Sequence, residues 1–414
     1  MHHGRVTILR IFGLLAALAA AAAAQAPGTA AAVNGTRLYY ESAGDGETVV
    51  LIHGALVDSR IWDPQFAALA EKFRVIRYDQ RGHGRSARNH TQPHSPVEDL
   101  HALLEQLQVG QAHLVGASAG GHIALDYALA HPERVLSLTL IESAVGGVPY
   151  DGESAGAIVE LVGIARGGDP ERAAQMFAAL PFLESLARNR PPEHRRLAQI
   201  IAEHAFQFTQ PKDLLMAEQP AAERLSQLRA PTLIMVSEFA DSHARKVADL
   251  LQSRIGPAHR VAIAGAGHAI NLEKPQEFTR ALTNFLERIV AERRSAARVD
   301  ATRVLAVMFH ADWCPTCKII EPRLRNIERE FAGQPILFTR FDLTDDFTIE
   351  QSARYAALLG LETYLEQSSG RTGYMLLLDR ETKKVLGEVR VKMSDDEIRA
   401  ALTNAIAATA KRTE

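Results

Sequence analysis

Cysteine is scarce in this chain: its 414 residues contain only two, Cys314 and Cys317. Both lie in the segment HADWCPTCK, and no cysteine comes before them. Because the chain contains no third cysteine, any other thiol or disulfide that reacts with this pair must belong to another molecule.

The chain also lacks an excess of basic residues. Lys and Arg total 46 against 49 Asp and Glu, which gives a net charge of −3. A protein that neutralises many phosphates needs a basic surface, so nucleic acid is excluded as an expected partner.

Long apolar runs are missing except near the N-terminus. There, Arg5 and Arg10 precede an apolar run from Ile11 to about Ala24, followed by small residues. This layout is typical of a secretory signal, predicted here as residues 1–26. A retained anchor is the alternative, but the run is shorter than the about 18–20 residues that a span needs. We therefore expect no stable membrane span after signal removal, and a periplasmic or secreted protein.

Short aliphatic runs alternate with amphipathic stretches from residue 33 to about residue 290. The predicted strands are residues 48–54, 73–79, 112–118, 135–142, 231–237 and 260–265. Their nearly continuous apolar character indicates a parallel sheet covered by helices on both faces. The fold class is therefore α/β, with a doubly wound and mostly parallel sheet.

Three changes in this pattern divide the chain. Residues 146–222 contain helical stretches and no evident strand, which predicts a helical lid. Residues 291–302 are polar and charged, which indicates a linker. A second α/β pattern follows, with strands from Val304, at 336–342 and in a hairpin-like pair, and helices that include 348–360 and one from about Ser394. The predicted parts are a signal peptide at 1–26, an α/β domain at 27–290, the linker and a smaller domain at 303–414.

A serine motif lies in the first α/β domain. GASAG, residues 116–120, follows a predicted strand and precedes a predicted helix, the setting in which a sharp turn exposes the Ser118 hydroxyl. The Ala119 N–H, with the Ala55 N–H from HGA at 53–55, is placed to stabilise an oxyanion. His268 follows the last predicted strand, where a base reaches the serine.

These motifs resemble those of the α/β-hydrolases, in particular the group of lidded esterases, carbon–carbon hydrolases and haloperoxidase-like enzymes. The resemblance rests on LIHG, RYDQRGHGRS (77–86), the turn at Ser118 and GHAINLEKP around His268. It implies an α/β-hydrolase sheet with a helical lid and a Ser-His-acid triad. It also implies that Asp79, Arg81 and His83 shape a loop rather than act in catalysis.

Two carboxylates compete for the third position of the triad. The family usually places the acid in a Gly-x-x-Asp segment after the penultimate strand. This chain reads VSEFADSH there, so Ala240 takes the usual position and Asp241 comes one residue late. A family variant takes the acid from the end of the preceding strand, where this chain has Glu142. Both stay open, with Glu238 as a third candidate.

Apolar side chains of the predicted lid indicate which kind of substrate the site accepts. They are Leu161, Met176, Phe177, Phe182, Phe206 and Phe208. They favour a small apolar acyl substrate, and the alternative is that they only pack the lid helices together.

The two cysteines follow an apolar strand and begin a predicted helix. A helix N-terminus stabilises a thiolate at Cys314, and Cys317 lies one turn later, where it can resolve a mixed disulfide. WCPTCKIIEP resembles the thioredoxin superfamily, specifically its exported branches, with Trp313 before the first cysteine and Pro322 at the family spacing. The resemblance implies a thioredoxin-like domain with a redox-active Cys314–Cys317 disulfide and an external thiol or disulfide partner.

One feature departs from that family. Where the family has a cis-proline that faces the disulfide, this chain has SGRTGYMLLLD, with Thr372 near that place. A structural disulfide and a zinc site are the alternatives. Zinc needs about four ligands and His310 is the only near neighbour in the sequence, so no metal is predicted.

Together, the motifs predict an exported serine hydrolase that acts on an ester or related acyl bond and carries a thiol-disulfide module. Neither reaction implies a cofactor. The alternative is a thiol-disulfide factor whose hydrolase-like domain is a non-catalytic binding module.

Overall fold

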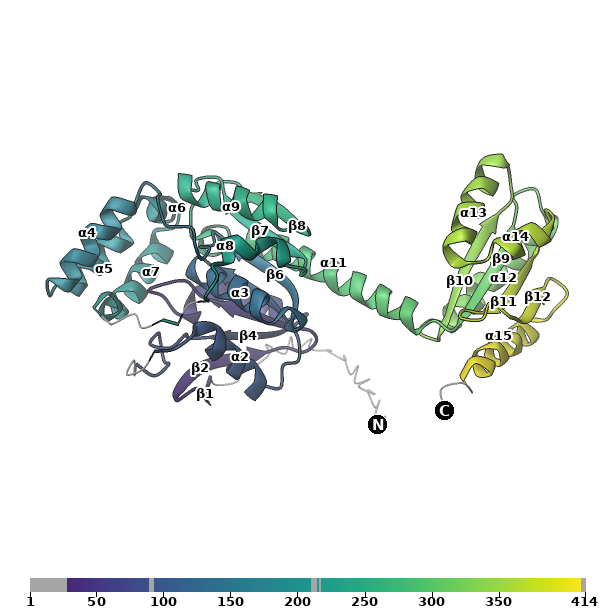
Figure 1. Ribbon diagram of the computed structural model, residues 1–414, viewed down its shortest axis with the longest axis horizontal. Coiled ribbons are helices and arrows are strands. Elements are labelled where there is room, and N and C mark those ends of the chain that lie inside the picture. The colour runs from purple at the N-terminus through teal and green to yellow at the C-terminus, as the bar shows by residue number, and fades with distance from the viewer. Residues whose placement is uncertain (1–27, 89–92, 210–213, 216, 411–414) are drawn as a thin grey trace, which may run out of the picture. The chain divides into compact units, whose positions relative to one another are not determined.

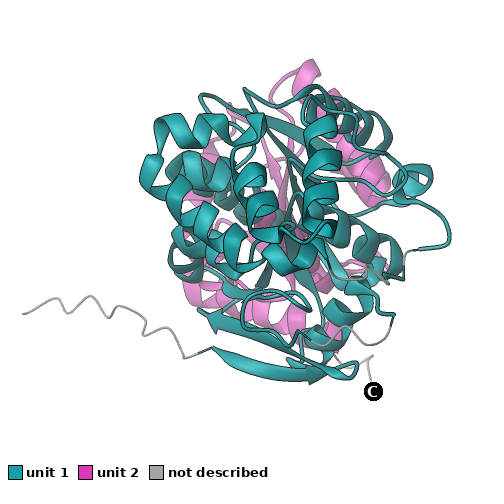
Figure 2. Ribbon diagram, turned by 90° about the vertical axis from the view of Figure 1, so that its left-hand side faces the viewer, with its two compact units in different colours: residues 1–289 teal, residues 290–414 magenta. Residues whose placement is uncertain are grey.

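The computed structural model describes residues 28–88, 93–209, 214–215 and 217–410. The predicted signal peptide, residues 1–26, lies outside the described residues. The chain divides into two compact units, residues 1–289 and 290–414 (Figures 1 and 2). Each unit is described by itself.

The first unit is built on an eight-stranded sheet in the order β1-β2-β4-β3-β5-β6-β7-β8. The strands are β1 (Thr29–Val33), β2 (Thr36–Ala43), β3 (Thr48–Ile52), β4 (Arg74–Tyr78), β5 (Ala112–Ala117), β6 (Val135–Ile141), β7 (Thr232–Ser237) and β8 (Ala258–Ile263). From β4 to β8 every pairing is parallel, whereas β1 and β2 pair antiparallel at one edge. The predicted fold class is confirmed, and β1 and β2 were not predicted.

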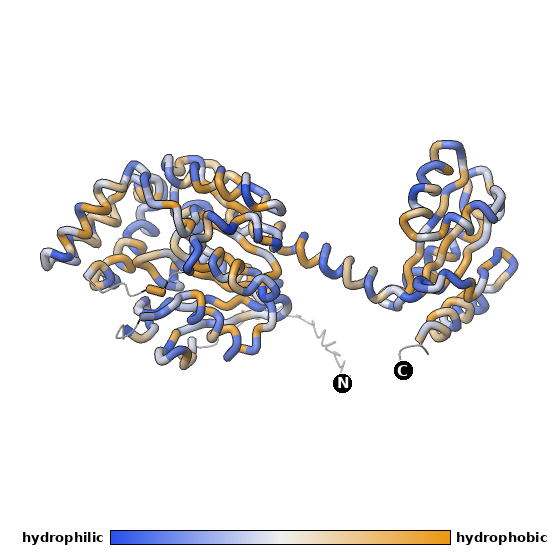
Figure 3. The backbone as a smooth tube through the Cα atoms, viewed as in Figure 1, coloured by the Kyte–Doolittle hydropathy of each residue, from blue (hydrophilic) through white to orange (hydrophobic). Residues whose placement is uncertain are grey.

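Helices bury the sheet. They are α1 (Asp63–Ala70), α2 (Pro96–Gln106), α3 (Ala119–Ala130), α9 (Ser242–Arg254), α10 (Ile270–Glu273) and α11 (Pro275–Ala301). Every residue of β3, β6 and β7 is buried, as expected for strands covered on both faces. The apolar stripe of α2 packs into the main core with α3 and α9. Figure 3 shows the strands of this sheet as largely hydrophobic.

The predicted lid segment is helical in its described residues. Its helices are α4 (Ala155–Arg166), α5 (Pro170–Ala178), α6 (Glu184–Asn189), α7 (Pro191–Glu203) and α8 (Ala221–Arg224). Leu161, Ala165, Ala173 and Leu180 form a small core between α4 and α5. The lid follows β6, so it begins at the carboxyl ends of the parallel strands.

The second unit has a four-stranded sheet in the order β10-β9-β11-β12. Its elements are β9 (Val304–His310), α12 (Pro315–Glu330), β10 (Ile336–Asp342), α13 (Asp346–Leu359), α14 (Glu362–Ser368), β11 (Tyr374–Asp379), β12 (Val385–Arg390) and α15 (Asp395–Ala410). β9 pairs parallel with β10 and antiparallel with β11, which also pairs antiparallel with β12. This is the predicted thioredoxin-like order of elements, with α14 as an addition.

The segment predicted as a linker is helical up to Ala301, because α11 continues through the boundary between the two units at residues 289 and 290. Among the described helices, none combines the length and the apolar character that crossing a membrane requires.

Candidate active sites

Ser118 lies on the turn between β5 and α3 in a strained backbone conformation. Its φ of 53° and ψ of −119° fall where residues with a side chain are rare. The Ser118 N–H donates to Ile141 O at 2.9 Å, and the Ala144 N–H donates to Ser118 O at 3.1 Å. The turn is thus fixed to the end of β6, and it exposes the serine at the carboxyl edge of the sheet.

His268 lies beyond β8 at the same edge and contacts Glu142. The His268 Nδ1 is 3.6 Å from Glu142 Oε2, and the two side chains are 30% and 2% exposed. Glu142 follows β6 with a φ of 44°, and its Oε1 accepts a hydrogen bond of 2.5 Å from the Ser237 N–H at the end of β7. A buried, fixed carboxylate therefore faces one imidazole nitrogen. Among the described residues, no hydrogen bond joins His268 to Ser118, and such catalytic hydrogen bonds are often long before a substrate is bound.

Asp241, the other candidate acid, is used differently. It is the N-cap of α9, and its Oδ1 accepts from the Ala244 N–H at 2.8 Å. Its Oδ2 accepts from the Tyr150 hydroxyl at 2.6 Å. Both Asp241 oxygens therefore have partners other than His268, whereas Glu142 contacts the histidine, so of the two candidate acids the structure favours Glu142. Glu238 is engaged as well, since its Oε2 accepts from the Gly265 N–H at 2.7 Å.

The two predicted oxyanion donors lie beside Ser118. Ala119 is the first residue of α3, so its N–H has no acceptor within the helix. Gly54, next to Ala55, approaches the serine so closely that a Cβ built on it would lie 3.3 Å from Ser118 Cβ. Ala55 and Ala119 both line one cavity of about 780 Å³.

This cavity reaches from the oxyanion alanines to the lid. The lid contributes apolar side chains to its wall: Ile158, Leu161, Val162, Phe177 and Phe208. Of the lid residues predicted to contact substrate, Leu161, Phe177 and Phe208 are among them. Met176, Phe182 and Phe206 are not among the residues that line this cavity. Met176 and Phe182 pack against the lid core, and Phe182 contacts the His268 ring at 5.0 Å between ring centroids.

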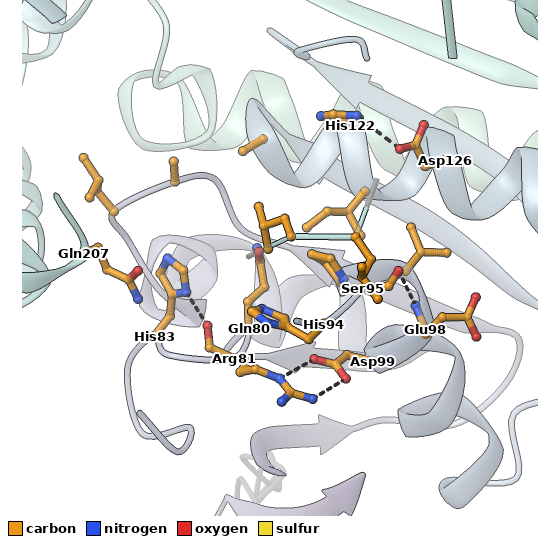
Figure 4. A pocket seen from close by; sticks show the side chains of 18 of the residues that line it. Gln80, Arg81, His83, His94, Ser95, Glu98, Asp99, His122, Asp126 and Gln207 are labelled. Carbon is orange, nitrogen blue, oxygen red and sulfur yellow. Dashed lines mark hydrogen bonds and ion pairs between the residues drawn. The ribbon is translucent and has the colours of Figure 1, made fainter. Parts of the chain in front are cut away.

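The RYDQRGHGRS loop forms part of the cavity wall and is held by its charged residues. Asp79 is buried and accepts hydrogen bonds from the Ser59 and Arg85 N–H groups at 2.9 and 2.8 Å. Arg81 makes two hydrogen bonds of 2.8 Å to the Asp99 carboxylate on α2 (Figure 4). These contacts agree with a loop-shaping role for Asp79 and Arg81.

A second pair of polar side chains in the cavity was missed. His122 Nε2 lies 3.1 Å from Asp126 Oδ2, one turn apart on α3. Figure 4 shows this pair and the Arg81–Asp99 pair on opposite sides of the cavity. The spacing of four residues on a predicted helix was a signal that could have found it.

In the second unit, Cys314 is the N-cap of α12 and Cys317 lies one turn into the helix. The Cys317 N–H donates to Cys314 Sγ at 3.1 Å. Burial raises the pKa of Cys314, but hydrogen bonds from the Cys317 thiol and the Thr372 hydroxyl outweigh it, so the pKa lies below its ordinary value. Burial, with the hydrogen bond to Cys314, raises the pKa of Cys317 to about 11. The two thiols are thus strongly unequal.

Thr372 and Gly373 occupy the place where a proline was expected. The Gly373 N–H donates to Phe309 O at 2.8 Å, and Gly373 has a φ of 86°. A Cβ there would lie 2.6 Å from Thr316 Cβ and 3.3 Å from Cys314 Sγ. Only glycine fits so close to the cysteine, and this brings the Thr372 hydroxyl to the thiolate.

Glu321 is another residue that the sequence did not single out. Its Oε1 contacts His310 Nδ1, and it shares a cluster with Cys317. The spacing of four residues from Cys317 to Glu321 on one helix was the available signal.

A doubly wound sheet with a serine on the turn after β5, a histidine after β8 and a helical lid after β6 is the architecture of an α/β-hydrolase. A model of the alpha/beta hydrolase family matches residues 49–281, and a thioredoxin model matches residues 289–355. The chain therefore belongs to the alpha/beta hydrolase family and carries a C-terminal thioredoxin domain.

Individual relatives match the first unit. A protein of Caulobacter sp. (strain K31) named "Putative carbamate hydrolase RutD" is 31% identical over 271 residues, which cover 60% of this chain and 95% of the relative. The 3-oxoadipate enol-lactonase 1 of Acinetobacter baylyi is 27% identical over 58% of this chain and 89% of its own. A solved esterase from Thermogutta terrifontis has a TM-score of 0.54 and 27% identity, covering 64% of this chain and 99% of its own.

Proposed function

We propose that the first unit is a serine hydrolase of esters or closely related acyl compounds. The observation that carries this proposal is the convergence of a strained Ser118, His268 and a buried Glu142 at one edge of the sheet, with 3.6 Å between His268 Nδ1 and Glu142 Oε2. A carboxylate on the far nitrogen of an imidazole fixes the tautomer that leaves the other nitrogen free to accept a proton.

In this mechanism Ser118 Oγ attacks the acyl carbonyl carbon while His268 Nε2 takes the hydroxyl proton. The Ala55 and Ala119 N–H groups stabilise the oxyanion. His268 then gives its proton to the leaving group, and water repeats the sequence on the acyl-serine. Glu142 stabilises the imidazolium that forms.

The cavity favours a compact acyl substrate with an apolar part. Its volume of about 780 Å³ is within the usual range for small-molecule sites, and its lid side is apolar. The relatives' names mention a carbamate hydrolase, an enol-lactonase and an esterase. Esters, lactones and carbamates all present a carbonyl to a nucleophile, so they form the substrate panel.

Labelling with a fluorophosphonate tests the nucleophile. We expect the full-length protein to be labelled at Ser118, and Ser118→Ala to lose both the label and ester turnover. Circular dichroism must show that the variant is folded. A folded wild-type protein that is neither labelled nor active on the panel would favour the alternative, a non-catalytic binding module.

The second unit is proposed to exchange thiols and disulfides with an external partner. The low pKa of Cys314 favours its thiolate as the attacking group, and the high pKa of Cys317 suits a thiol that resolves the mixed disulfide later. Reduction of a small peptide disulfide, lost in Cys314→Ser, tests this proposal.

Export through residues 1–26 is also a proposal and follows from the sequence pattern alone. Expression in a bacterial host, followed by N-terminal sequencing of the periplasmic fraction, tests it. Cleavage after Ala24 or Ala26 is the expected result, and an intact N-terminus would contradict it.

A further inference from the structure

The cluster around Cys317 contains more than a thiol-disulfide site requires. A ring nitrogen of His310, Cys317 Sγ and a Glu321 carboxylate oxygen all lie within 4.8 Å of one another. His310 is the last residue of β9, and Cys317 and Glu321 are one turn apart on α12. Three different ligand types therefore converge from two rigid elements.

The position of these groups suits a closed metal site. Cys317 is 1% exposed, and the side chains of His310 and Glu321 are 8% and 20% exposed. Tetrahedral zinc, with bonds of about 2.0–2.3 Å, needs neighbouring ligand atoms closer together than 4.8 Å. Binding zinc would therefore draw these ligand atoms together by about an ångström. Cys314 Sγ accepts the Cys317 N–H at 3.1 Å, so it lies next to this three-residue cluster and is the candidate for a fourth ligand.

His310 is also oriented as zinc-bound histidines are. Its Nδ1 faces Glu321 in the cluster, while its Nε2 lies 3.1 Å from Asp312 Oδ1, whose side chain is 79% exposed. A metal-bound imidazole almost always donates its other N–H to a carboxylate, which fixes the ring and strengthens the metal bond. Asp312 thus has the position of such a supporting group.

We propose that the reduced second unit binds one zinc ion through four side chains: Cys314, Cys317, His310 and Glu321. A mixed set of thiolate, imidazole and carboxylate ligands matches zinc better than magnesium or calcium, which prefer oxygen alone. The sequence disfavoured a metal because His310 was the only candidate ligand near the cysteines. The fold brings Glu321 into the cluster as a further candidate ligand.

Zinc binding and disulfide formation exclude each other, because both use the Cys314 and Cys317 thiolates. This consequence rests on the proposed thiol-disulfide function. When an external disulfide oxidises the site, the two thiolates lose two electrons and form the Sγ–Sγ bond. The external disulfide is reduced to two thiolates, and the zinc ion is released. Zinc therefore holds the site in its reduced form until a disulfide partner arrives.

Cobalt(II) titration of the reduced full-length protein tests the site, because tetrahedral cobalt absorbs visibly and thiolate ligands add a charge-transfer band. We expect one equivalent to bind and zinc to displace it. Glu321→Gln and His310→Gln should each weaken binding at least tenfold, whereas Glu328→Gln, a matched change on the same helix, should leave it unchanged. The disulfide form should not bind.

Three results would overturn the zinc site: no binding near one equivalent, a spectrum without thiolate charge transfer, or unchanged binding in both folded variants, which would mean that the cysteines alone hold the ion. Disulfide reduction is measured separately on metal-free protein. Turnover without metal binding overturns only the zinc site, whereas metal binding without turnover overturns only the proposed thiol-disulfide function.

Discussion

Leu56, Ser118 and Glu142 all have a positive φ, and all three lie around the proposed triad. Such conformations cost free energy and persist only where the surrounding structure holds them. Here the Ser118 N–H donates to Ile141 O of β6 and the Glu142 N–H donates to Met235 O of β7. The Glu142 carboxylate also accepts from the Ser237 N–H. The residues of the site are therefore positioned before any substrate arrives.

The choice between the two acids leads to a first prediction at this scale. Glu142→Gln removes the charge that stabilises the His268 imidazolium, so we expect kcat for a short-chain ester to fall by about 10³-fold or more. Asp241→Asn is the matched control, because asparagine also caps helices and the Asp241 oxygens accept from Ala244 and Tyr150 rather than from His268. Steady-state kinetics should show its kcat within about threefold of wild type. A larger loss in Asp241→Asn than in Glu142→Gln would reverse the assignment.

The cysteine pKa values give a second prediction. The pKa of Cys314 should lie below the ordinary cysteine value and that of Cys317 near 11, so thiolate absorbance should rise in two separate steps. Alkylation of Cys314 should speed up as pH rises through the lower step and then level off. Thr372→Val removes a hydrogen bond to the thiolate and should move that step to higher pH.

Thr403→Val, a similar change on α15, serves as the control and should leave both steps in place. If Thr372→Val also leaves the first step unmoved, the hydroxyl does not stabilise the thiolate.

Sequence motifs identified Ser118, His268 and the two cysteines, because each belongs to a short pattern tied to one turn or one helix end. They left the acid open. β6 and β7 are neighbours that end at the same edge, so Glu142 and Asp241 both follow suitable strands. The contact of Glu142 with His268 and the capping role of Asp241 favour Glu142, and neither is visible in spacing.

At the scale of elements, the buried strands were predictable because their apolar runs are continuous. The antiparallel strands β1 and β2 were not, although they meet at Asn34 and Gly35, which have φ values of 44° and 73°. An Asn-Gly pair between two strands is a strong hairpin signal, so the sequence did contain the information that predicts this hairpin. The short α14 has no comparable signal.

The attachment of the lid gives a third prediction. His204, just after α7, accepts the Gly84 N–H on its Nε2 at 2.8 Å, and its ring stacks on His83. His204→Phe keeps an aromatic ring there but leaves the Gly84 N–H unsatisfied, at a cost of about 1–3 kcal/mol. We expect faster hydrogen exchange in α7 and a several-fold higher KM, because Phe208 of the cavity wall follows directly.

His259→Phe, the same change at an exposed position on β8, is the control and should alter neither quantity. Unchanged exchange in His204→Phe would show that the lid is held by other contacts.

At the scale of the whole molecule, each unit has its own sheet and its own apolar core. Helix α11 crosses the boundary between them, where the sequence indicated only a polar linker. A polar helix surface and an extended linker share the same composition, so composition alone does not distinguish them.

Separate cores and separate sites give the last prediction. Cys314→Ser should leave kcat/KM for esters within about twofold of wild type, because the first unit contains no cysteine and its proposed triad uses no residue of the second. Ser118→Ala should likewise leave disulfide reduction unchanged. Reducing the disulfide should shift the thermal unfolding of the second unit alone, since a cross-link acts on the chain segment that it closes. Loss of ester turnover in Cys314→Ser, measured on folded protein, would mean that the redox state of the second unit controls the hydrolase.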